Sequence, residues 1–191
     1  MSNVRPQNRP MSHIVMLRTV LAALLLSLGS AWAQPSPKLY TLDPTGWQRN
    51  TTPSGEVFTC SVCEAQVQLQ IAVGPPIGPE AKFKTNEQFL AQLKTPEQQK
   101  NFADTMLRDQ IPLQSGFKIR IERTGLTKIG GQDAFQFMAV VELQPTATRD
   151  TTMFLLYKGR LVKVTVNYYD GTFSPKARDA LSKILGSIKF V

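Results

Sequence analysis

Two cysteines separated by two residues, Cys60 and Cys63, have the spacing in this chain that is best suited to chemistry. A C-x-x-C pair can bind zinc, exchange electrons with other thiols or form a structural disulfide. A structural zinc site takes four Cys or His ligands, but these are the only two cysteines and the single histidine is His13. We therefore expect no metal at this pair.

The residues that follow the pair favour a structural disulfide. A redox-active C-x-x-C pair usually lies at the N-terminus of a helix, which lowers the pKa of the first thiol. Here polar and apolar residues alternate from Gln66 to Val73, as in a half-buried strand. We expect Ser61 and Val62 to form the tip of a hairpin, with the cysteines flanking the turn and joined by a bridge. A thiol-disulfide oxidoreductase that uses the pair is the alternative.

Other catalytic motifs are missing from the sequence. No histidine follows residue 13, so the usual general base is absent from the rest of the chain. The chain also has no G-x-S-x-G motif and no Gly-rich phosphate loop followed by Lys. We expect a non-enzymatic protein with no catalytic residues and no cofactor.

Aromatic side chains gather towards the C-terminus and are candidates for a ligand-binding or partner-binding surface. A packed or half-exposed face of a sheet is the other interpretation, because aromatic residues are common on both kinds of surface. The four candidates are Tyr157, Tyr168, Tyr169 and Phe173.

The first 33 residues have the pattern of a cleavable secretory signal peptide. Three arginines, the last of them Arg18, precede an apolar run from Thr19 to Leu28, and no acidic residue occurs before Asp43. The run is too short for a membrane-spanning helix, and Ala31 and Ala33 form an A-x-A site. We predict cleavage after Ala33, a periplasmic or secreted protein and no transmembrane segment in the mature chain.

The remaining residues, 34–191, suit a single domain. We expect residues 34–45 to form an extended, flexible N-terminal segment. Loss of the three arginines lowers the net charge from +8 to +5, and the basic residues are scattered, so we expect no nucleic-acid partner. Met1, Met11 and Met16 are alternative initiators.

Periodicity predicts a sheet with a few helices. Thr85 and Thr95 each begin a helix, and a third helix begins at Pro175 and stops at Gly186. Residues 74–79 are rich in Pro and Gly and predict a loop that cannot continue a strand. The predicted strands cover residues 57–59, 66–73, 117–122, 135–143, 153–157 and 161–169, with hairpin turns at Gly130-Gly131 and Lys158-Gly159 and a short extended end at 187–191.

Sequential hairpins with helices between and after them indicate an α+β fold, an antiparallel β-sheet with helices packed on its faces. The C-terminal part also resembles the PsbP-like family. The resemblance covers roughly residues 116–191 and depends on the Gly-Gly hairpin with Phe135 on its return strand, the strand pair 153–169, Phe173, the last helix and the segment Ile188-Lys189-Phe190. It implies an α/β/α sandwich and a role in binding or assembly.

Together these features predict an exported, non-enzymatic binding or assembly module of the bacterial cell envelope. Its partner would be an envelope protein or ligand that the sequence does not identify. A carrier of a small apolar ligand is a further option, and it requires an internal cavity.

Overall fold

The computed structural model describes residues 38–110, 118–143, 146–169 and 173–191. The predicted signal peptide, residues 1–33, and its cleavage site lie outside these residues, as do the candidate initiators.

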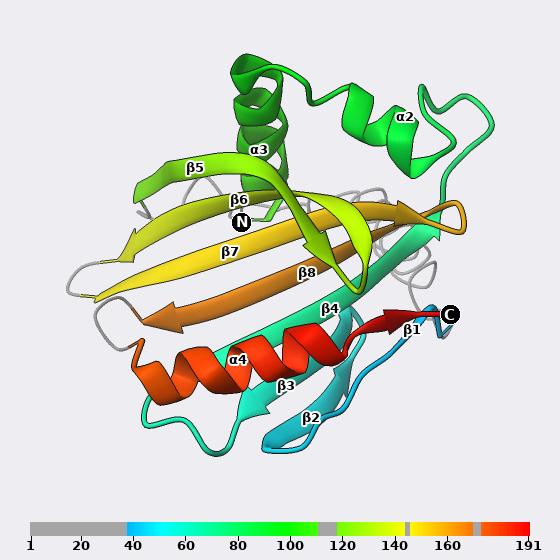
Figure 1. Ribbon diagram of the computed structural model, residues 1–191. Helices are drawn as coiled ribbons and strands as arrows, with labels where there is room; N and C mark the ends of the chain where they lie inside the picture. Colours follow the sequence, from blue (N-terminus) through cyan, green and yellow to red (C-terminus); the bar gives the residue numbers. More distant parts are fainter. Residues whose placement is uncertain (1–37, 111–117, 144–145, 170–172) are drawn as a thin grey trace, which may run out of the picture. The chain divides into compact units, whose positions relative to one another are not determined.

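One antiparallel sheet of seven strands dominates the described residues, in the order β2-β3-β4-β8-β7-β6-β5 (Figure 1). A separate two-stranded sheet pairs β1 with β9. The fold is α+β, as the sequence predicts. The strands are β1 (Tyr40–Thr41), β2 (Trp47–Thr52), β3 (Gly55–Cys60), β4 (Val67–Pro76), β5 (Lys118–Ile129), β6 (Gln132–Leu143), β7 (Thr146–Tyr157), β8 (Arg160–Tyr169) and β9 (Lys189–Phe190).

Two hairpins of the sheet are closed by the two-residue turns that the sequence predicts. Gly130 and Gly131 join β5 to β6, with φ of 55° and 78°. Lys158 and Gly159 join β7 to β8, with φ of 47° and 68°. Positive φ at both central residues gives a turn whose twist matches that of the flanking strands.

Alternation along β7 and β8 divides the apolar residues between two cores. Helix α4 (Pro175–Ser187) contributes Ala177 and Ile184 to the first core, which includes alternate residues of the central strands. Successive side chains of a strand point to opposite faces, so this core lies on one face of the sheet. Its strand members include Leu69, Ile71, Leu155, Val162, Val164 and Val166.

The second core lies on the opposite face of the sheet and contains alternate residues of β6 and β7. It also contains buried residues of α2 (Asn86–Ala91) and α3 (Pro96–Gln110), and Phe89 of α2 is 1% exposed. Phe102 of α3 packs edge to face with strand residues Phe135 and Phe154, at centroid distances of 5.4 Å. The strand members of this core are Phe135, Phe137, Ala139, Phe154 and Leu156.

Side-chain caps begin the helices where the sequence predicts them. The hydroxyl of Thr85 accepts a hydrogen bond from the backbone N–H of Gln88, whose side chain completes a capping box. The last helix, however, continues through Gly186 to Ser187. Ile188, which follows it, is 2% exposed, and its N–H bonds to the carbonyl of Leu185. Burial of Ile188 therefore determines where this helix ends, and the glycine does not stop it.

The loop expected at residues 74–79 begins later than predicted. Strand β4 continues to Pro76, with an irregular register between Val73 and Pro76 that accommodates the prolines. Arg160 donates a hydrogen bond of 3.0 Å to the carbonyl of Gly74, and the N–H of Ile77 donates to the carbonyl of Gly159. Contacts with the neighbouring strand thus hold this Pro-rich stretch in the sheet.

The described part of the predicted N-terminal segment is held against the domain. Leu39 and Tyr40 are 6% and 7% exposed, and the backbone N–H of Val191 donates to the carbonyl of Leu39. The hydroxyl of Tyr40 donates a 2.5 Å hydrogen bond to Glu56. Burial, and then the bond to Glu56, raise the pKa of Tyr40 above its ordinary value. The two ends of the described chain therefore meet in the short β1-β9 sheet.

Candidate functional site

Cys60 and Cys63 form a disulfide, with their Cα atoms 5.6 Å apart. Cys60 is the last residue of β3, opposite Trp47 of β2. The register of β3 and β4 pairs Thr59 with Gln68, so the connection between these strands is longer than the two-residue tip predicted from the sequence. The cysteines therefore do not flank a tight turn: the bridge joins the end of a strand to the middle of a loop.

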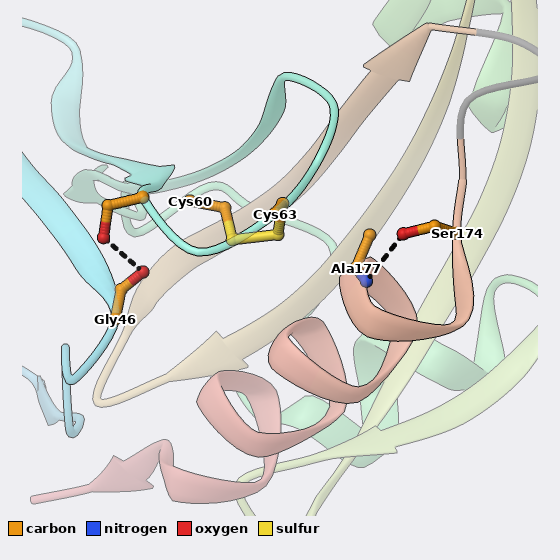
Figure 2. The surroundings of a disulfide bond; sticks show 6 residues. Gly46, Cys60, Cys63, Ser174 and Ala177 are labelled. Carbon is orange, nitrogen blue, oxygen red and sulfur yellow. Dashed lines mark hydrogen bonds between the residues drawn. A yellow bond between two sulfur atoms is a disulfide. The ribbon is translucent and has the colours of Figure 1, made fainter.

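The disulfide lies at the edge of the core under α4 and is largely buried. Cys60 is 7% exposed and belongs to the core under α4, and Cys63 packs against that core. Figure 2 shows the bridge beside the first turn of α4, near Ala177. The next residue, Ser61, donates from its N–H and its hydroxyl to the carbonyl of Gly46, at 3.0 and 2.9 Å. The loop is thus tied to the chain that leads into β2.

Two of the candidate aromatic residues lie at the same end of the sheet as the disulfide. The ring of Tyr168, near the end of β8, stacks on the ring of Phe173, with centroids 4.4 Å apart. Both pack against the core that contains Cys60. Tyr169 follows on the opposite face of β8 and is 43% exposed. Three of the four predicted aromatic residues therefore share one end of the molecule.

Tyr157 is not part of that group. It pairs with Arg160 at the turn between β7 and β8, whereas Tyr168 lies near the far end of β8. Eight residues of strand separate the two ends, about 26 Å at 3.3 Å per residue. The ring of Tyr157 instead contacts Phe190, at a centroid distance of 5.0 Å, and Lys158 Nζ lies 5.7 Å from its centre. A single groove lined by all four aromatic residues does not form.

We call the end of the sheet that carries the disulfide the cystine end, and define it by the bridge, Tyr168, Tyr169, Phe173 and the exposed Val62. Val62, at the tip of the disulfide loop, is 45% exposed, similar to Tyr169. Exposed apolar and aromatic side chains therefore occur at this end of the sheet, Val62 between the two cysteines and Tyr169 on the opposite face of β8.

A small polar hollow of about 110 Å³ opens at the same end. Its lining comes mainly from the central strands β4, β7 and β8, on the face opposite the α4 core. Each described lining residue carries an amide, hydroxyl or phenol group, so the hollow can form hydrogen bonds with a ligand. The described residues that line it are Gln66, Gln68, Thr148, Asn167, Tyr168 and Tyr169.

Asp150 lies next to the lining of this hollow, in register with Asn167 of the neighbouring strand and two residues along β7 from Thr148. Burial raises the pKa of Asp150, and hydrogen bonds from Asn167 and Thr148 oppose the shift. Its Oδ1 atom is buried and has no hydrogen-bond partner among the described residues. The adjacent Arg149 points to the other face of β7 and pairs there with Glu122, at 2.5 Å. No arginine from its own strand therefore neutralises Asp150.

Sequence reasoning missed Asp150, Thr148 and Asn167. The glutamines of β4 appear in the sequence as the polar members of an alternating strand, which suggests a solvated face. Asp150 stands next to Arg149, and such a charged pair is typical of a surface. The residues around it, 146–152, are almost all polar, so no local pattern indicates a buried carboxylate.

Within the described ranges, no group of three His, Cys, Asp or Glu side chains lies close enough to hold a metal ion. None of the helices that the structure describes has the length and apolarity needed to cross a membrane.

Comparison of the sequence with protein-family models and with curated proteins finds no match. Comparison with solved structures does find similar folds. The cyanobacterial PsbP protein CyanoP of Synechocystis sp. PCC 6803 matches with a TM-score of 0.56 and 14% identity, over 83% of this chain and 90% of that one. The fold is PsbP-like. The likeness includes most of the chain, more than the C-terminal part from which the resemblance was inferred.

A second structure is less similar. LpqN of Mycobacterium tuberculosis, described as involved in cell envelope biogenesis, matches with a TM-score of 0.48 and 13% identity, over 83% of this chain and 87% of that one.

Proposed function

We propose that this protein is an exported, non-enzymatic binding or assembly module of the bacterial cell envelope, and that it binds its partner at the cystine end. The observation that carries the proposal is the exposure of two large apolar side chains, Val62 and Tyr169, at the end of the sheet that carries the disulfide. Exposed aromatic and aliphatic groups next to a rigid support are typical of protein interfaces. The Tyr168–Phe173 stack provides that support.

The disulfide supports the proposed compartment. Disulfides persist in oxidising compartments such as the periplasm, and they are rare in the reducing cytosol. A signal peptide in residues 1–33 would take the chain to such a compartment. Analysis of the exported protein's N-terminus by mass spectrometry tests this part: Gln34 is expected as the first residue, and a retained N-terminal segment would contradict it.

The domain architecture supports a scaffold for binding. We propose that α4 on one face and α2 with α3 on the other make the domain an α/β/α sandwich of the PsbP type, consistent with the two cores. In such an arrangement packing occupies most of both faces of the central strands, which leaves the ends of the strands and their loops for recognition.

Site-specific photo-crosslinking in the native envelope tests the binding surface. A photoreactive residue at position 169 is expected to give one adduct of defined mass. The same residue at position 126 is the control, because Leu126 is more exposed, at 62%, and lies on edge strand β5. Val62→Asp should reduce the adduct from position 169, whereas Val191→Asp, at a similarly exposed valine, should not. Equal adducts from both positions would contradict the proposal.

A thiol-disulfide oxidoreductase is the second candidate, and the position of the bridge beside the first turn of α4 favours it (Figure 2). A helix N-terminus stabilises a nearby thiolate. Burial of Cys60 argues against an oxidoreductase, because an attacking thiol must reach its substrate. The reduction potential separates the two: about −120 to −200 mV would indicate a redox enzyme, and a value below about −300 mV a structural bridge.

A further inference from the structure

We propose that the polar hollow at the cystine end is a binding site for an alkylammonium or guanidinium group, positioned by the buried carboxylate of Asp150. This inference rests on the proposed function and specifies the chemistry of one part of its surface. It starts from the polar groups at the centre of the sheet, which occupy neighbouring positions on one face of β4, β8 and β7.

The hollow lies over the most central strands. Gln68 of β4 and Asp150 of β7 are both in register with Asn167 of β8, so the three residues form one row across the sheet. Equivalent positions further along β7, Phe154 and Leu156, are covered by α2 and α3. The next row towards the second core, Gln70, Thr165 and Thr152, is also polar. This part of the face is therefore polar where the second core ends, and polar groups placed there cost stability unless they have partners.

Asp150 orients the groups around it. An ionised carboxylate only accepts hydrogen bonds, so Asn167 and Thr148 must donate to it. The Asn167 carbonyl oxygen and the remaining lone pairs of the Thr148 hydroxyl can then accept hydrogen bonds from a ligand. The hollow therefore offers acceptor atoms beside a negative charge. A ligand group rich in N–H donors and carrying positive charge matches that arrangement.

The surrounding charges support a cation. On β7, Arg149 points to the opposite face and pairs with Glu122. On β8, Lys163 shares the face of Asp150 but pairs with Phe154, four residues further from the hollow along the strand. The phenol ring of Tyr169 at the rim can contact a cation through its face. At about 110 Å³, the hollow holds a small head group and not a folded chain.

Titrations of the purified protein test the site. Calorimetry measures the affinity, and the NMR signals of the Asn167 amide and the Tyr169 ring report where the probe binds. Butylammonium and methylguanidinium are the free probes, and a blocked peptide with one lysine between glycines represents a side chain of a partner protein. We expect binding of the cations with shifts at both residues, and no such shifts with urea or inorganic phosphate. Tighter binding of the peptide would identify a protein partner as the source, and tighter binding of the free probes a small molecule.

Two variants test the role of Asp150 and its neighbour Thr148, and a third variant is the control. Asp150→Asn keeps the shape but removes the charge, and should weaken binding at least tenfold. Thr148→Val removes an acceptor at nearly constant volume and should weaken it several-fold. Gln70→Ala, on the same face of β4 but outside the hollow, should leave the affinity unchanged within twofold.

The proposal is overturned if the Asp150→Asn protein, with a folded NMR spectrum, binds the cations as well as the natural protein does. It is also overturned if no cation shifts Asn167 and Tyr169 at millimolar concentration, or if urea or phosphate shifts them equally. Crosslinking from position 169 distinguishes this failure from that of the proposed function. An adduct that persists in the Asp150→Asn protein leaves the binding module intact and removes only the cation site.

Discussion

The ring of Phe173 stacks on that of Tyr168, with an angle of 24° between their planes. This contact joins the end of β8 to the residue just before the cap of α4, Ser174, whose hydroxyl accepts from the N–H of Ala177. The stack thus links the position of α4 to the central strand and supports the aromatic part of the cystine end.

Replacement of Phe173 by Ala should lower the free energy of unfolding by about 2 kcal/mol, because a partly buried ring and its stacking partner are lost. Denaturation in urea measures this change. Phe190→Ala is the matched control, because Phe190 makes a similar contact with Tyr157 at the other end. Both variants should be destabilised, but only Phe173→Ala should reduce crosslinking from position 169.

Replacement of both cysteines by Ala should destabilise the protein by about 2 kcal/mol, the entropic effect of a closed loop this short. The variant should still fold, since the two cores supply most of the buried apolar surface. Urea denaturation of the natural protein with and without reductant should give the same difference. Failure of the variant to fold would show that the bridge is essential to the domain.

Asp150 should make stability depend on pH. Burial raises the pKa of this carboxyl in the native state, so the native state binds its proton more tightly than the unfolded chain does. Its contribution to stability is therefore present below the ordinary pKa, about 4, and is lost as pH rises through the raised pKa. The unfolding free energy of Asp150→Asn, relative to the natural protein, should increase across this window. A difference that is independent of pH would contradict the burial of the charge.

The two glycines of the β5-β6 turn should respond differently to substitution. A Cβ at Gly130 would lie 2.8 Å from a ring carbon of Phe190 and 3.0 Å from the carbonyl oxygen of Ile188. A Cβ at Gly131 would meet nothing within 4 Å. We expect Gly131→Ala to cost about 1 kcal/mol, from its positive φ alone, and Gly130→Ala about 3 kcal/mol. Thermal denaturation would show the difference, and equal losses would contradict the close packing of β9.

Much of the fold follows from local sequence. The turns at Gly130-Gly131 and Lys158-Gly159 require positive φ, and alternation in the flanking strands assigns residues to opposite faces. Thr85 and Ser174 cap their helices through short-range hydrogen bonds. Each of these features depends on residues a few positions apart, which is why the sequence alone predicts them.

The candidate site depends on contacts that no local pattern specifies. Strand β4 pairs with β8 across some hundred residues, and this pairing puts Gln68 beside Asn167 and separates Tyr157 from Tyr168. Asp150 is half-buried between Ala139 of β6 and Asn167 of β8, although its own segment resembles an exposed one. The spacing of the cysteines and the presence of the aromatic residues are thus determined by the sequence alone. Which aromatic residues meet, and which carboxylate lies without a full set of partners, followed only from strand order and register, because hydrogen bonding across the sheet is non-local.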